Sequence, residues 1–405
     1  MEQNGAAGRN EWSWVYLPTR APVQEIAVRA IEGASGPKAL GHVNQIAVEQ
    51  AKHRQQSDVH KRTAGAIRLP CMNTRYTLLT LLLCAVLPAQ TPRGWTKGKG
   101  FGWVFGDADE IGAINAINTP AQVLRALRDI KTGRVYDLGV RVDRTSYKWP
   151  GHSPTEILSF RSPLGLRTGK DIAGFQGDTR NLGFHSCALF MSDNVGTQID
   201  GLGHITTGAD NHWYNGFREA EHATDFGITR ADADSIPPVI GRAVLVDVAG
   251  WKGVDALPGN FPIGPQELQA ALAAQNTQLA PGDIVLIRTG TLRHWGATGA
   301  NHQIIARHDS AGLTLAGAKW LVEQQGAVFI GSDTSGLEVG ADPGVPGKAI
   351  PVHEYLLVEQ GVHIGEFHYL EDLARNKAYR FTYIAMTNRL KGTVAGTALR
   401  PIAIE

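Results

Sequence analysis

The sequence predicts an α/β protein whose folded part is a single domain around a mixed sheet. Three observations support this: β-type apolar runs alternate with helical patterns in the middle of the chain, strand patterns dominate the ends, and no linker divides it. The composition agrees, because 43% hydrophobic and 19% charged residues are ordinary for a globular protein. The net charge of +1 gives no reason to expect a nucleic-acid partner.

The elements follow from local patterns along the chain. Strands are predicted within residues 135–142, 185–192, 242–250, 281–290, 327–333, 362–368, 379–386 and 398–405, and helices at 264–275, 314–326 and 350–361. The run RAVLVDVAG at 242–250 is almost continuously apolar, which is typical of a strand buried on both faces. Pro265 suits the first position of its helix, and Gly326 is placed to end the following one.

The first 90 residues differ in character from the rest. Residues 1–71 show no sustained period and are expected to be disordered, or to be an upstream extension that is not translated. Residues 72–90 combine a positive charge at Arg75, an apolar run at 77–87 too short to span a bilayer, and the small residue Ala89. This layout predicts a secretory signal peptide beginning at Met72; a buried core helix is the alternative. The folded domain would then be 91–405, secreted or periplasmic and without a membrane segment in its mature form. Without that start it would be cytoplasmic.

The segment DNVGTQIDGLGHI at 193–205 concentrates polar side chains between glycines, directly after a predicted strand. Asn194, Gln198, Asp200 and His204 are evenly spaced, so an extended chain would direct them to one side. A carboxylate, two amide oxygens and an imidazole suit a divalent cation of intermediate hardness. A polar turn with Asx-type hydrogen bonds explains the same residues, and this segment alone leaves both readings open.

The segment resembles the HxGTHxDxPxH signature of the cyclase family of metal-dependent hydrolases, which includes bacterial kynurenine formamidases and isatin hydrolases. Further similar segments follow in family order: WPGH (149–152), VLVDVAG, GDIVLIRTG, AKWLVEQQGAVFIGSDTSGLE and PVHEYLLVEQGVHIGE. The resemblance covers residues 135–375. It implies the swivelling β/β/α fold of this family, a small-molecule substrate and a homo-oligomer, either a dimer or a tetramer.

The resemblance also implies roles for individual residues. Asp200, His353 and Glu366 match metal ligands of the family, and His204 matches its proton donor and acceptor. Asn194 and Gln198 stand where the family has two histidines, and Leu202 replaces its proline. Amide oxygens are harder ligands than imidazoles, so we expect one divalent metal rather than two, and Mn²⁺ in preference to Zn²⁺. In this interpretation Asn194 and Gln198 are additional ligands, or Gln198 orients one.

The expected activity is hydrolysis of a C–N or C–O bond in a small amide, an isatin-like cyclic amide or an ester. An N-formylkynurenine formamidase and a non-catalytic small-molecule binder on the same fold are the alternatives. Trp149 is expected near the substrate by resemblance, and Trp213 with Tyr214 could form an aromatic wall because they lie just downstream of the signature. Asp333 is expected to shape a loop near the site. Cys187 lies in the middle of a predicted strand and is expected to be buried.

Overall fold

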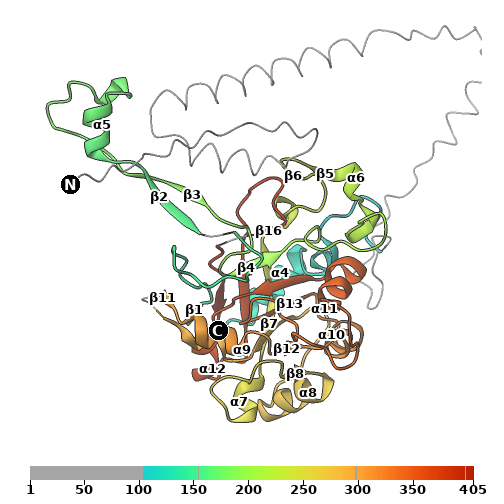
Figure 1. Ribbon diagram of the computed structural model, residues 1–405. Helices are drawn as coiled ribbons and strands as arrows, with labels where there is room; N and C mark the ends of the chain where they lie inside the picture. The colour runs from blue at the N-terminus through green and yellow to red at the C-terminus, as the bar shows by residue number, and fades with distance from the viewer. Residues whose placement is uncertain (1–103, 154, 297–298, 397) are drawn as a thin grey trace, which may run out of the picture. The chain divides into compact units, whose positions relative to one another are not determined.

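The computed structural model describes residues 104–405 apart from 154, 297–298 and 397 (Figure 1). Residues 1–71 and the predicted signal peptide at 72–90 therefore lie outside the described residues. Among the helices that are described, none combines the length and the apolar character needed to cross a bilayer.

A nine-stranded mixed sheet forms the centre of the described part (Figure 1). Its strands are, in spatial order, β1 (Val135–Asp137), β17 (Ile402–Ile404), β15 (Arg380–Ala385), β7 (Val239–Asp247), β9 (Ile284–Arg288), β13 (Phe329–Ser332), β14 (His363–Glu366), β4 (Gln198–Asp200) and β16 (Ala395–Gly396). The four strands β7, β9, β13 and β14 run parallel, and antiparallel strands flank them on both sides. The predicted α/β class with a mixed sheet is confirmed.

Every residue of β9, β13 and β14 is buried, so these strands are covered on both faces. Beside the sheet lie α7 (Val248–Lys252), which packs against β9, and α8 (Pro265–Ala274), which packs against β7; α8 also contacts α10 (Leu315–Lys319), which in turn contacts α11 (Pro351–His353). The last two continue into π-helical turns, η6 (Trp320–Gln325) and η7 (Glu354–Gln360), which end at left-handed Gly326 and Gly361. A further helix, α4 (Pro120–Arg128), packs against β7.

One predicted strand lies outside the main sheet. Residues of the segment 185–192 form β3 (Ser186–Phe190), which among the described strands pairs with β2 alone (Glu156–Arg161) in a two-stranded ribbon; α5 (Pro163–Gly169) lies in its connection. A ribbon of two strands has no second layer to cover it. Leu158, Phe160 and Leu189 are therefore exposed. Cys187 is exposed as well, so the prediction that it is buried is wrong.

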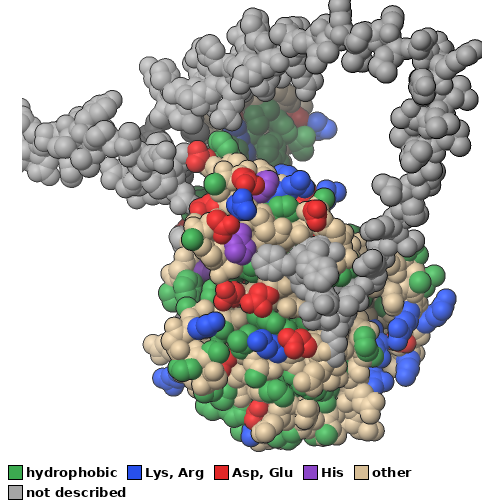
Figure 2. All heavy atoms as spheres, turned by 90° about the vertical axis from the view of Figure 1, so that its right-hand side faces the viewer, with side chains coloured by type: hydrophobic (Ala, Val, Ile, Leu, Met, Phe, Trp, Pro, Cys, Tyr) green, Lys and Arg blue, Asp and Glu red, His purple; other side chains and the backbone are tan. Residues whose placement is uncertain are grey.

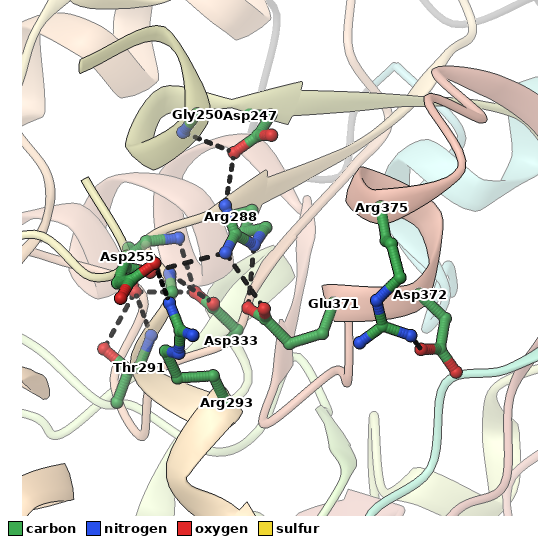
Figure 3. A network of polar contacts seen from close by, with 12 residues as sticks. Asp247, Gly250, Asp255, Arg288, Thr291, Arg293, Asp333, Glu371, Asp372 and Arg375 are labelled. Atoms are coloured by element: carbon green, nitrogen blue, oxygen red, sulfur yellow. Dashed lines mark hydrogen bonds and ion pairs between the residues drawn. The ribbon is translucent and has the colours of Figure 1, made fainter. Parts of the chain in front are cut away.

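The carboxyl ends of β7, β9 and β13 carry a buried network of charges, shown in Figure 3. The Arg288 guanidinium donates to both oxygens of Glu371, at 2.7 and 3.0 Å, and to Asp247 at 2.8 Å. Asp333 accepts from the backbone N–H groups of Thr289 and Gly290, each at 2.7 Å, and so fixes the turn after β9. Burial raises the pKa of the Asp333 carboxyl to about 6.

Replacing Arg288 by methionine is expected to destabilise the protein by about 3–5 kcal/mol, because it leaves two buried carboxylates without their cation. The matched control is Arg375→Met, which removes an ion pair to Asp372 whose arginine side chain is 68% exposed, against 8% for Arg288. The Arg375→Met change should lower the free energy of unfolding by less than about 1 kcal/mol. Denaturant unfolding of both variants measures the difference, and equal losses would contradict this account of the network.

Candidate metal centre

Strand pairing brings three of the predicted site residues onto one face of the sheet. β4 runs antiparallel to β14, with Gln198 opposite Glu366 and Asp200 opposite Ile364. Side chains alternate along a strand, and directly opposed residues share a face, so the side chains of Gln198, Asp200 and Glu366 lie together. On the other side of β4 the partners are Ala395, opposite Asp200, and Gly396, opposite Ile199.

The fourth residue, His353, comes from the helix that precedes β14. It is the last residue of α11, where the chain passes into the π-helical turn η7, a type of turn that is frequent at functional sites. Its Nε2 lies 3.5 Å from Glu366 Oε1 and 3.9 Å from Asp200 Oδ2. Asp200, His353 and Glu366 each offer one ligand atom, and these atoms lie within 4.8 Å of one another. The three ligands that the resemblance implied are thus brought together.

The two amide side chains hold the carboxylates from the other side. Asn194 Nδ2 donates to Asp200 Oδ1 at 3.0 Å, and Gln198 Nε2 donates to Glu366 Oε2 at 2.7 Å. Among the described residues, Asp200 Oδ2 and Gln198 Oε1 are buried acceptors without a hydrogen-bond partner. Buried oxygens of this kind are costly unless something positive satisfies them, so the donor set fits a divalent cation. Asn194 has an orienting contact here, and its role as a ligand stays a prediction, as does that of Gln198.

The charges at the site depend strongly on one another. Burial, and then repulsion by Asp200, raise the pKa of the Glu366 carboxyl. Burial lowers the pKa of His353, but hydrogen bonds to Glu338 and Glu366 outweigh it and raise that pKa to about 10. Without a metal ion, the protonated imidazole of His353 therefore supplies the positive charge between the carboxylates.

This balance predicts a pH dependence of stability. The folded-state pKa of His353, about 10, lies above its ordinary value of 6.5, so its contribution is complete below pH 6.5 and is lost as the pH rises toward 10. Metal-free protein should accordingly melt at a lower temperature as the pH rises through this window. Added Mn²⁺ should raise the melting temperature more near pH 10 than near pH 6.5. At the higher pH His353 has lost its proton, so the metal ion no longer competes with that proton for the imidazole. Thermal melts with and without Mn²⁺ measure this, and a metal effect independent of pH would contradict it.

His204 lies beside the cluster without belonging to it. It follows β4 in a loop that Thr207 ties to η7, through a 2.7 Å hydrogen bond to Glu354. The imidazole rings of His204 and His353 have centroids 6.4 Å apart. Within the described part of the chain, His204 Nδ1 is a buried atom with no hydrogen-bond partner. The role of His204 in proton transfer stays a prediction.

The predicted aromatic wall does not match the structure. Trp213 is 1% exposed and donates from Nε1 to the carbonyl of Arg230, and Tyr214 is 2% exposed and donates to Asp109. Both side chains belong to the core, because the loop after the signature turns them inward. Trp149 is 53% exposed, and its ring packs edge-on against His152 with centroids 5.6 Å apart.

The sequence analysis did not assign two residues that lie near the site. Glu338 hydrogen-bonds to the Nδ1 of His353. His152 approaches Ser192 Oγ at 3.2 Å, and its pKa is lowered by burial and then by His204, so its ring lies near the site. His152 was visible inside the segment WPGH, whereas nothing in the sequence marks Glu338 as a neighbour of His353.

The visible face of the described part in Figure 2 carries acidic and basic side chains among apolar ones, in keeping with the small net charge.

The chain is similar to known proteins in sequence and in fold. The sequence profile of the family described as "Putative cyclase" matches residues 136–339. A crystal structure of a novel cyclase is 29% identical, with a TM-score of 0.63 over 76% of this chain and 100% of that chain. Isatin hydrolases A from Labrenzia aggregata and Ralstonia solanacearum are each 19% identical, with TM-scores of 0.47 and 0.48; they cover 67% and 70% of this chain and 94% and 97% of their own. No curated protein matches the chain significantly.

Proposed function

The chain belongs to the cyclase family whose profile it matches, and from this premise we propose that it is a metal-dependent hydrolase of a small amide, cyclic amide or ester. One observation carries the proposal. Asp200, His353 and Glu366, which are remote in sequence, converge on one point. Within the described residues, Asp200 Oδ2 and Gln198 Oε1 are buried there without a hydrogen-bond partner, and the ring of His204, whose Nδ1 is also unpartnered, lies beside that of His353.

The residues present divide the chemistry between them. Asp200, His353 and Glu366 would hold a divalent ion, which supplies polarisation of a carbonyl group and acidification of water. His204 would remove a proton from the attacking water as its oxygen bonds to the carbonyl carbon. It would return that proton to the leaving nitrogen or oxygen as the old bond breaks, so protons balance over one turnover. Asn194 and Gln198 keep the carboxylate oxygens oriented throughout.

The test is removal and replacement of the metal, followed by a substrate panel of isatin, N-formylkynurenine, lactones and aryl esters. Chelation should abolish turnover, and Mn²⁺ should restore it better than Zn²⁺, because amide side chains stand in place of two imidazoles. Full turnover by chelated protein would exclude the mechanism. Turnover of N-formylkynurenine alone would identify a formamidase, and tight binding of a panel compound without turnover would identify the non-catalytic binder.

We further propose that the protein is a homo-oligomer whose subunits bury the β2–β3 ribbon. The support is the exposed apolar side chains of Leu158 and Phe160 on β2 and of Leu189 on β3. Leu158 pairs with Ala188 and Leu189 with Ile157, so both faces of this two-stranded ribbon expose apolar side chains, and such a ribbon is marginally stable alone. Phe160→Asp should shift the mass in light scattering toward the monomer. Leu124→Asp, which changes an exposed leucine of α4, should leave the mass unchanged. A monomeric wild-type protein would refute this proposal.

For the N-terminal region, we propose that translation starts at Met72 and that residues 72–90 direct export. The mature hydrolase would then be released outside the cytoplasm. The support is the charged and apolar layout of that segment. N-terminal sequencing of exported protein should find a start near residue 90, and retention of residues 1–71 would refute it.

A further inference from the structure

Glu338 makes a set of contacts that joins a helix terminus to the candidate metal centre. It lies after β13, in a loop whose backbone bridges to Leu313, and its carboxylate is buried. Oε2 accepts from the backbone N–H of Val352 at 3.0 Å, and Oε1 accepts from the backbone N–H of His353 at 3.3 Å. The same Oε1 also accepts from Nδ1 of the His353 ring.

The backbone contacts alone are those of a helix cap. The first N–H groups of a helix have no partner within it, and a carboxylate satisfies them and is favoured by the helix dipole. The ring contact adds something that a cap does not need. It places the Nδ1 proton on the side of Glu338, which leaves Nε2 as the nitrogen that faces Asp200 and Glu366.

The geometry points to Glu338 as a positioning residue that selects Nε2 of His353 for metal binding and fixes the direction of its lone pair. This inference rests on the metal site proposed above, but not on the hydrolytic activity. The ring needs such a partner because it stands at the junction of α11 and η7, where Asp200 and Glu366 face its Nε2 but do not hold its Nδ1. A ligand histidine whose second nitrogen is unbonded can rotate or bind through the wrong nitrogen, and loss of such a partner weakens metal affinity by about 10–100-fold.

The experiment compares Glu338→Gln and Glu338→Ala with wild-type protein. The matched control is Glu354→Gln, which removes a carboxylate from the first turn of η7 that contacts Thr207. Mn²⁺ affinity is measured by paramagnetic resonance of the free ion, at a temperature where thermal melts show each variant to be folded. In metal-free protein, proton resonance spectra follow the Nδ1 proton of His353, which should be far downfield and slow to exchange.

We expect Mn²⁺ affinity to fall by about 10–100-fold in Glu338→Gln, and the Nδ1 resonance to move upfield, while Glu354→Gln changes neither. A purely structural cap would lower the melting temperature of the Glu338 variants and leave the Mn²⁺ affinity of the folded protein unchanged. That result would overturn the inference. If wild-type protein bound no Mn²⁺, the metal site itself would fail. The resonance would then still decide whether Glu338 orients the ring, since it is observed without metal.

Discussion

Changing Asp200 to asparagine is expected to abolish both metal binding and turnover. Asp200 is fully buried, and its two oxygens have different partners: Oδ1 accepts from Asn194 and Gln198, whereas Oδ2 faces His353 without a hydrogen bond among the described residues. Asparagine keeps the side-chain volume but removes the negative charge. Its amide NH₂ group would also face either another hydrogen-bond donor or the metal ion, and it can accept neither. Metal stoichiometry should fall from one per chain to below detection, and the rate to that of chelated protein.

The control for this change lies in the loop before β4. Asp193 accepts from the backbone N–H groups of Val394 and Ala395, at 2.7 and 3.2 Å, and so holds β16 beside β4. Asp193→Asn should lower stability but leave the metal content of the folded protein intact. Metal analysis and turnover measured on the same sample of each variant separate the two roles. An Asp200→Asn protein with full metal and full turnover would remove Asp200 from the site.

The sheet was predictable because burial on both faces leaves a strong local signal. The runs that became β7, β9 and β13 are almost purely apolar, and the glycines that end the helices were visible in the sequence. The ribbon β2–β3 was not predictable in this way, because a strand pattern does not reveal how many strands will pair with it. Cys187 was misplaced for this reason: its strand exists, but it pairs with β2 in a ribbon outside the main sheet, and the side chain is exposed.

The candidate site could be anticipated as a set of residues but not as a geometry. The resemblance supplied Asp200, His353 and Glu366, yet the antiparallel register that opposes Gln198 to Glu366 joins segments more than a hundred residues apart. No local pattern encodes such a pairing. The orientation of an amide side chain is equally invisible, because Asn194 can present either an oxygen or an N–H group. Only its neighbour Asp200 selects the N–H group.

The position of Trp213 and Tyr214 shows a further limit. Both follow the signature closely, and proximity in sequence suggested proximity to a substrate. The loop that carries them reverses direction, and Tyr214 packs against the backbone of Gly361 at the end of η7, so the rings fill the core instead. Closeness to a motif in the sequence therefore does not show that a side chain lines a pocket. Its burial in the folded protein decides whether it faces a pocket or the core.

The last prediction separates proton transfer from metal binding at His204. Its imidazole lies beside that of His353 but outside the group of three ligands, and its Nδ1 is not engaged within the described part of the chain. His204→Ala should therefore keep its metal, while the rate falls by about two to four orders of magnitude, the usual effect of losing a general acid–base. The control is His212→Ala, the same change at a histidine that lies eight residues later and contacts Asp210. This variant should keep both the metal content and the turnover rate of the wild-type protein.

Metal content and turnover of His204→Ala decide between two roles. If the variant folds but loses its metal, His204 is a ligand, and proton transfer must be assigned elsewhere. Asp333 is a poor replacement, because Thr289 and Gly290 enclose its carboxylate in the core. His152 would then be the better candidate, since its half-buried ring lies near His204 and is held by Ser192 at the rim of the site. A slow, metal-replete His204→Ala with normal melting behaviour would instead establish His204 as the proton carrier, because neither lost metal nor lost structure would explain the slow rate.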